Sequence, residues 1–152
     1  MADPALKIQS FLAPGSIALD MRAPDKITLL RDLAQRASKL VPLSSTDIFA
    51  ELSRREELGS TGIGGGVAIP HARFPGIEAP VALAARLKPP INFDAIDGLP
   101  VDLLFVLLVP SSASGDHLNA LAAVSRKLRE RSIVDQLRTI KDAEGFYRLL
   151  TE

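Results

Sequence analysis

The stretch VDLLFVLLV, residues 101–109, is apolar at every position except Asp102. A nearly continuous apolar run of this length is typical of a buried strand at the centre of a sheet. Turn-forming residues lie on both sides of it, because Asp97-Gly98 precedes the run and Pro110 follows it. We therefore predict a central strand over these residues.

Three segments upstream of this run also have strand character. Residues 81–87 place an apolar side chain at every second position, as a half-buried strand does. Residues 67–69 are β-prone, and residues 17–19 form a candidate short strand before Pro24. We expect Pro89-Pro90 to break the strand pattern that begins at residue 81.

Apolar residues recur at helical spacing in the remaining segments. The first helix is predicted over residues 27–41 and ends at Pro42. The second begins at the capping sequence Ser44-Ser45-Thr46-Asp47 and ends at Gly59. Three further helical patterns follow the central run and cover residues 118–128, 133–140 and 143–150.

Strands that are mixed among helices predict an α/β layered fold. The chain has 152 residues, which is enough for one well-buried domain and short for two. We expect a single domain over residues 1–152, with its core over about residues 8–150. Its mixed parallel and antiparallel sheet should have about five strands, flanked by helices on both faces.

Composition excludes several classes of protein. Lys plus Arg balance Asp plus Glu, 18 against 18, so no net positive field is available for nucleic acid or an anionic membrane. No apolar run approaches the roughly 20 residues that span a bilayer, so we expect no membrane insertion. The chain has no cysteine, which rules out disulfides and cysteine metal sites. The cytoplasm is the expected location.

The stretch GSTGIGGGVAIPHA, residues 59–72, places glycines and hydroxyls just before His71. Glycine allows positive φ and close backbone approach, so several N–H groups of such a loop can converge on an anion. Ser60 and Thr61 add hydroxyl donors, although both residue types are also common in ordinary turns. The imidazole of His71 can act as a ligand or as a nucleophile near neutral pH. We interpret the stretch as a phosphate-handling site.

Better-known phosphate motifs do not fit this stretch. A Walker-type loop needs a lysine and a Ser or Thr after its last glycine, but Gly66 is followed by Val67. A dinucleotide fingerprint lies between a strand and a helix, whereas here a helix precedes the loop and a β-prone run follows it. A metal site is also disfavoured, because two histidines without cysteine leave carboxylates to supply the other ligands.

The whole pattern resembles the IIA component of the bacterial phosphoenolpyruvate-dependent phosphotransferase system, in the fructose/mannitol class that includes the nitrogen-regulatory IIA proteins. The residues that carry the resemblance around the histidine are Glu56, Ile63-Gly64 and VAIPHA at residues 67–72. The likeness extends over residues 55–56, 59–62, 93–97, 100–104, 109–110 and 117–118. It therefore covers most of the chain.

This resemblance implies that His71 accepts a phosphoryl group from a phosphohistidine of an HPr-like carrier, with Nε2 favoured as the attacking nitrogen. No cofactor and no metal are implied. Arg55 would stabilise the phosphohistidine; its alternative role is a cation opposing the helix dipole. His117 would lie near the acceptor; its alternative role is a capping or surface histidine. The implied phosphate-binding residues are Ser60, Thr61, Gly62 and Gly64.

The sequence FDAID at residues 93–97 favours the nitrogen-regulatory branch, although Gly65 and Asn119 depart from common choices there. We expect a stand-alone IIA unit, a phosphocarrier rather than a complete enzyme. Its partners would be an NPr-type carrier and regulated proteins such as a potassium transporter or a sensor kinase. The alternatives are a sugar-specific IIA that passes phosphate to a IIB protein, and a phosphate-independent binding module.

Other residues near the glycine-rich stretch are ambiguous. Ile63, Val67 and Phe74 are candidates for a partner surface, and simple core packing is the better interpretation for Val67 but not for Phe74. Asp94 and Asp97 could be paired catalytic carboxylates, but Asp97-Gly98 favours a turn and Asp94 a loop hydrogen bond.

Overall fold

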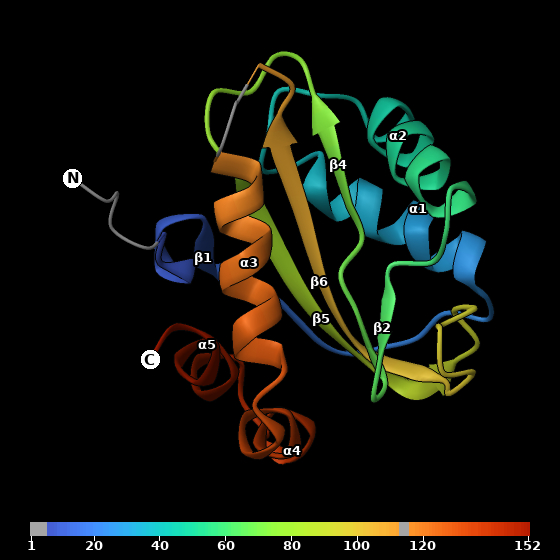
Figure 1. Ribbon diagram of the computed structural model, residues 1–152, viewed down its shortest axis with the longest axis vertical. Helices are drawn as coiled ribbons and strands as arrows, with labels where there is room; N and C mark the ends of the chain where they lie inside the picture. Colours follow the sequence, from blue (N-terminus) through green and yellow to red (C-terminus); the bar gives the residue numbers. More distant parts are fainter. Residues whose placement is uncertain (1–5, 113–115) are drawn as a thin grey trace.

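The computed structural model describes residues 6–112 and 116–152, which form an α/β domain with a six-stranded mixed sheet and five α-helices (Figure 1). The main strand order is β1-β5-β6-β3-β2, and β4 also pairs with β6. The strands are β1 (Leu12–Met21), β2 (Gly62–Gly64), β3 (Val67–Ala68), β4 (His71–Phe74), β5 (Val81–Ile91) and β6 (Val101–Pro110). The helices are α1 (Lys26–Ala37), α2 (Ser45–Glu57), α3 (Asp116–Leu128), α4 (Arg131–Thr139) and α5 (Ala143–Thr151), and a short 3-10 helix covers Ile8–Ser10.

Strand β6 is the centre of the sheet, as predicted from its apolar run. It pairs antiparallel with β5 along one edge, for example Leu83 with Val106. Along its other edge it pairs in parallel first with β3 and then with β4. The run is apolar except at Asp102 because alternate residues enter two different cores, Leu104, Val106 and Leu108 in one and Leu103, Phe105, Leu107 and Val109 in the other.

The sheet separates these two cores. Helices α1 and α2 cover one face, where Leu33 and Leu52 are fully buried. Helices α3, α4 and α5 cover the opposite face, where Val124 and Phe146 are buried (Figure 1). Each large apolar side chain buried this way contributes about 1.5–3 kcal/mol, so the sandwich of helices around the sheet is the main source of stability. No helix of the described residues is both long and apolar enough to cross a membrane.

Side-chain caps define the starts of two helices on the first face. The Ser44 hydroxyl accepts a hydrogen bond from the Asp47 N–H at 3.1 Å, which confirms the predicted start of α2. Asp25 caps α1 by accepting from the Thr28 N–H at 2.7 Å. The hydrogen bonds from Thr28 lower the pKa of Asp25 below its usual value.

Three details differ from the sequence prediction. The first helix ends at Ala37 rather than at residue 41, and the residues up to Val41 form turns. The strand expected at residues 17–19 is β1, which runs from Leu12 to Met21. Pro89-Pro90 lie inside β5, where the ladder to β6 shifts register between Arg86 and Ile91. The last β1 partner of β5 is Leu87, so the two prolines occupy a stretch that β1 does not pair with.

Candidate functional site

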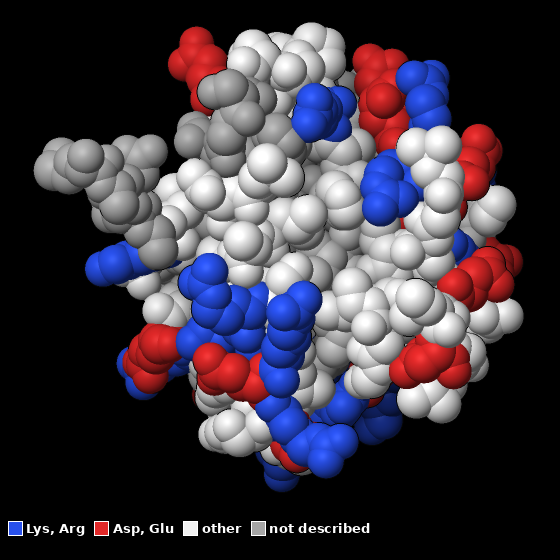
Figure 2. All heavy atoms as spheres, viewed as in Figure 1, with Lys and Arg blue, Asp and Glu red and all other residues white. Residues whose placement is uncertain are grey.

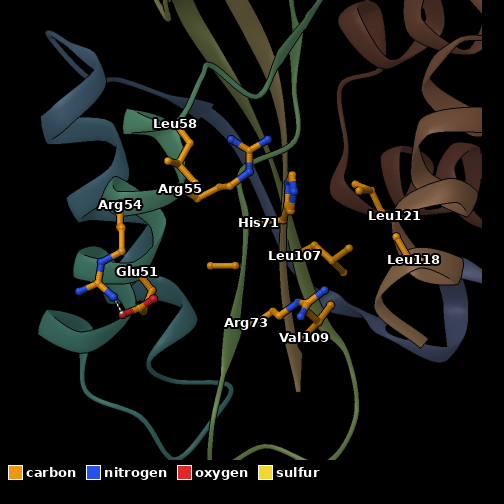
Figure 3. Close-up of a pocket in the computed structure, with 11 residues that line it drawn as sticks. Glu51, Arg54, Arg55, Leu58, His71, Arg73, Leu107, Val109, Leu118 and Leu121 are labelled. Carbon is orange, nitrogen blue, oxygen red and sulfur yellow. Dashed lines mark ion pairs between the residues drawn. The ribbon is translucent and has the colours of Figure 1, made fainter. Parts of the chain in front are cut away.

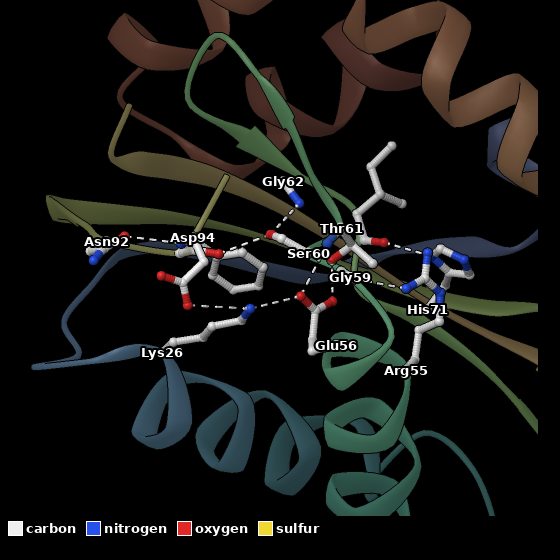
Figure 4. Close-up of polar contacts among 12 residues, drawn as sticks. Lys26, Arg55, Glu56, Gly59, Ser60, Thr61, Gly62, His71, Asn92 and Asp94 are labelled. Carbon is white, nitrogen blue, oxygen red and sulfur yellow. Dashed lines mark hydrogen bonds and ion pairs between the residues drawn. The ribbon is translucent and has the colours of Figure 1, made fainter. Parts of the chain in front are cut away.

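His71 is the first residue of β4 and its side chain is half-buried. The imidazole Nδ1 lies 2.8 Å from the carbonyl oxygen of Ile69. Figure 4 shows His71 beside Arg55 at this site. A carbonyl oxygen can only accept, so Nδ1 carries the proton of the neutral ring and donates it to Ile69. The lone pair of that tautomer is then on Nε2, which makes Nε2 the nucleophilic atom of the ring.

The backbone around His71 is held rigidly by β6. Val67 and Ala68 pair with Leu103 and Leu104, and the Leu107 N–H donates to the Pro70 carbonyl at 2.9 Å. His71 itself pairs with Leu107. Strands β3 and β4 therefore follow one edge of the central strand, and Pro70, which has no N–H, falls between them. This arrangement fixes the base of the imidazole.

A hollow of about 410 Å³ opens beside His71 (Figure 3). Its polar lining consists of His71, Glu51, Arg54, Arg55 and Arg73, and its apolar lining consists of Leu58, Ala72, Leu107, Val109, Leu118 and Leu121. Leu58 and Leu118 are 82% and 60% exposed, so the hollow has an apolar rim that water contacts. Exposed apolar side chains gathered around a polar site are typical of a surface that docks another molecule.

Arg55 extends from the last turn of α2 toward His71, in both Figure 3 and Figure 4. Its Nη1 donates to the carbonyl of Gly59 at 2.8 Å, just past the end of the helix. Among the described residues this is the one hydrogen bond of its side chain. A guanidinium has five N–H donors, so most of them remain to bind an anion in the hollow. The bond to Gly59 also matches the alternative role of a cation near a helix C-terminus.

Glu56, the neighbour of Arg55, is a buried carboxylate with three polar contacts to two residues (Figure 4). It accepts from the Thr61 N–H at 3.0 Å and from the Thr61 hydroxyl, and it pairs with Lys26 Nζ at 3.0 Å. The Lys26 ammonium in turn lies 4.5 Å from the centre of the Phe93 ring. This cluster ties the end of α2 to the loop that follows it. Sequence reasoning included Glu56 in the motif but did not anticipate this role.

The four residues predicted to bind phosphate have structural partners of their own. The Ser60 hydroxyl donates to the Phe93 carbonyl at 2.9 Å and accepts from the Gly62 N–H at 3.0 Å. Thr61 is buried against Glu56. Gly64 lies near Asp97, at the tip of the β2–β3 hairpin. None of the four lines the hollow at His71, and a phosphate contact by them stays a prediction.

His117 is the second residue of α3, but its side chain lies outside the described part of the structure. Two other residues of that helix, Leu118 and Leu121, line the hollow beside His71. The start of α3 therefore borders the site, and a contact between the two histidines stays a prediction.

The structure also shows which of the candidate partner-surface residues are exposed. Phe74 is 1% exposed and packs in the core beneath α2, so its assignment to a partner surface is wrong. Val67 is buried as expected, and Ile63 is 43% exposed.

Asp97 has a structural role in a turn. It accepts from the Gly65 and Leu99 N–H groups at 2.9 and 3.1 Å, and these hydrogen bonds lower its pKa. The Asp94 N–H donates to the Asn92 side chain at 3.0 Å.

The described residues contain no group of three or more His, Cys, Asp or Glu that could hold a metal ion.

The chain matches a known family over residues 10–152, and it belongs to that family: phosphoenolpyruvate-dependent sugar phosphotransferase system, EIIA 2. Within it, the chain is a homologue of the nitrogen-regulatory IIA proteins. It is 41% identical to a nitrogen regulatory protein of Bradyrhizobium diazoefficiens, with 95% of each chain covered. It is 37% identical to that of Pseudomonas aeruginosa, with 97% of this chain and 96% of the other covered.

The fold is also that of a solved relative. The crystal structure of nitrogen regulatory protein IIA-Ntr from Neisseria meningitidis superposes with a TM-score of 0.90 at 40% identity. That match covers 95% of this chain and 99% of the other.

Proposed function

We propose that this protein is a phosphohistidine carrier with a regulatory output. His71 Nε2 accepts a phosphoryl group from the phosphohistidine of an HPr-like carrier of the NPr type. The observation that carries this proposal is the hydrogen bond from Nδ1 to the Ile69 carbonyl, because it directs the lone pair of the ring to Nε2. Membership of the family supports an HPr-like partner.

The transfer exchanges one N–P bond for another. The Nε2 lone pair forms the new bond to phosphorus while the bond in the donor breaks, and its electron pair stays on the donor nitrogen. The donor ring, protonated on its other nitrogen, leaves as a neutral imidazole, and His71 keeps its Nδ1 proton. Charge and protons balance without a further co-reactant. The Ile69 carbonyl stabilises the cationic phosphorylated ring by accepting from that N–H.

Arg55 supplies the positive charge that this transfer needs. The transferring phosphoryl group spreads negative charge over its oxygens, and fixed donors around it lower the barrier. A guanidinium fork matches the spacing of phosphate oxygens better than an ammonium does. Its bond to Gly59 limits the movement of the side chain.

The apolar rim explains how phosphorylation can change partner binding. Leu58, just past the end of α2, and Leu118, in α3, border the hollow and offer a docking surface beside His71. A phosphoryl group adds about −1.5 to −2 charges at the middle of that surface. A partner that buries the rim would be released or recruited by this charge. Regulated partners of the kind that the resemblance suggests are a potassium transporter or a sensor kinase, with the protein itself in the cytoplasm.

The test is phosphoryl transfer from phosphoenolpyruvate through an enzyme I and an HPr-like carrier. Wild-type protein should gain acid-labile label, and His71→Ala should gain none. His117→Ala is the second variant. If this variant is still labelled on His71, the acceptor is His71 and not His117. Label on His71→Ala would overturn the assignment. If no competent carrier labels the wild-type protein, the phosphate-independent binding module becomes the favoured function.

A second assay separates regulation from sugar transport. The phosphorylated protein is mixed with fructose or mannitol IIB proteins, and the loss of its label is followed with time. We expect slow or no donation. Rapid donation to a sugar IIB would replace the regulatory proposal with the transport one.

A further inference from the structure

A second hollow, of about 650 Å³, lies between the β2–β3 hairpin and helices α3 and α4. It has no lining residue in common with the hollow at His71 among the described residues. Helix α3 borders both, with Leu118 and Leu121 at the first and Ser125 and Leu128 at the second. The second hollow is therefore a separate place on the molecule, and its volume is in the range of small-molecule sites.

Three arginines surround this hollow. Arg138 is held by a forked ion pair with Asp102, at 2.9 and 3.0 Å, and by a hydrogen bond to the Gly65 carbonyl. The side chains of Arg129 and Arg131 have no hydrogen bond or ion pair with any described residue. Figure 2 shows Lys and Arg gathered over the lower part of this face, with Asp and Glu among them, where Figure 1 places the end of α3 and α4. Two unpaired guanidiniums beside one fixed guanidinium favour a ligand with phosphate oxygens.

The remaining polar groups make the hollow selective. Asp135 lines it from α4 and has no hydrogen-bond or ion-pair partner among the described residues. A carboxylate repels a small inorganic anion, but it accepts well from the hydroxyls of a sugar. The Ser125 hydroxyl lines the hollow from α3. This set of groups fits a ligand that has phosphates at one end and hydroxyls at the other.

The rest of the lining is apolar, from Ile63, Val67, Leu128 and Val134. Val67, Leu128 and Val134 belong to the core beneath α3 and α4, so they form a firm base. Ile63 is 43% exposed on the hairpin and can cover a ligand from the side. An apolar base beside charged groups suits a flat aromatic ring better than a second polar group.

From this arrangement we propose that the second hollow binds a nucleotide. The phosphates lie between Arg129 and Arg131, the ribose hydroxyls donate to Asp135, and the base packs on the apolar lining. The proposal concerns binding alone and does not depend on phosphoryl transfer at His71.

The experiment is a titration of ¹⁵N-labelled protein with ADP, followed by amide chemical shifts. We expect saturable shifts at Gly64, Gly65 and Ser125 in the wild type. The same shifts should appear in His71→Ala. The double variant Arg129→Gln/Arg131→Gln should bind at least tenfold more weakly, a change of about 1.4 kcal/mol, because it loses two charged donors to the phosphates. Arg126→Gln is the matched control, because Arg126 is a neighbouring arginine that does not line this hollow. It should bind ADP as the wild type does.

Pyrophosphate is the second probe. Asp135→Asn should weaken ADP but not pyrophosphate, and pyrophosphate should bind more weakly than ADP to the wild type. The proposal is overturned by an absence of saturable shifts with ADP, by shifts that the double variant retains, or by shifts that centre on His71. Equal affinity for pyrophosphate and ADP would also overturn it, because the apolar lining and Asp135 would then contribute nothing. Circular dichroism of each variant is the control for correct folding.

Discussion

The Nδ1 atom of His71 lies 2.8 Å from the carbonyl oxygen of Ile69, two residues earlier in the chain. This contact is local in sequence, but it depends on β3 and β4 both pairing with β6, which holds the residues between them in place. One backbone carbonyl thereby selects the tautomer of the histidine.

The first prediction concerns that tautomer. When the His71 imidazole is neutral, long-range ¹⁵N–¹H spectra should show its proton on Nδ1 and the lone pair on Nε2, because the Ile69 carbonyl can only accept. After phosphorylation, the ¹⁵N–³¹P coupling should be found on Nε2. A proton on Nε2 in the neutral protein, or coupling to Nδ1 after labelling, would contradict the proposed geometry.

The second prediction concerns pH and Asp97. Hydrogen bonds from the Gly65 and Leu99 N–H groups lower the pKa of Asp97 from its usual 3.8 in the folded protein. The stabilisation is therefore fully present above the unfolded pKa and is lost as pH falls through the folded one. Chemical unfolding of wild type and Asp97→Asn at a series of pH values should show a stability difference that is constant near neutral pH and shrinks below about pH 4.

The control for Asp97 is Glu57→Gln. Glu57 is an exposed carboxylate at the end of α2 with no hydrogen bond or ion pair to the described residues. Its difference from wild type should not change over the same acidic range. A difference for Asp97→Asn that stayed constant into strong acid would show that its hydrogen bonds do not favour the ionised form.

The third prediction concerns the ion pair between the buried Glu56 and the partly exposed Lys26. Glu56→Gln should lower the free energy of unfolding by about 1–3 kcal/mol, because the amide has one acceptor oxygen in place of two and no charge to pair with Lys26. Denaturant unfolding of Glu56→Gln, Lys26→Met and the double variant completes the cycle. The double variant should be less destabilised than the sum of the two single ones. Additive losses would mean that the pair is not coupled.

The two-faced burial of the central strand was predictable, because a run with one polar residue in nine leaves no face for water. Strand β4 was missed for a physical reason. Its four residues, His71 to Phe74, alternate polar and apolar, but a run of only four residues after Pro70 is too short to indicate a strand by itself. They are extended because β6 offers them a partner edge. The same missing information made Phe74 resemble a surface residue, although the helix above it buries it completely.

Within the site, residues of the local motif could be anticipated, and contacts between segments far apart in the chain could not. Arg55 and His71 were selected from the motif, and the structure places both at one hollow. A phosphate contact by Ser60 stays a prediction, but the bond of its hydroxyl to the carbonyl of Phe93 could not be anticipated, because the two residues are 33 positions apart and only the fold brings them near. The Lys26 contact with Glu56 is hidden in the same way, because nothing in the local pattern of either helix relates them.

The last prediction separates Arg55 from its neighbour. Arg55→Ala should slow phosphoryl transfer to His71 by about 10²-fold, the cost typical of removing one fixed donor from developing charge. Arg55→Lys should recover only part of the rate, because an ammonium lacks the planar fork. Arg54 lines the same hollow but pairs with Glu51 at 3.1 Å, so Arg54→Ala should change the rate by a few-fold at most. Single-turnover transfer from the phosphorylated carrier gives the rates. Equal losses for the two alanine variants would assign the effect to the general positive charge of the hollow, and wild-type transfer by Arg55→Ala would remove Arg55 from the mechanism.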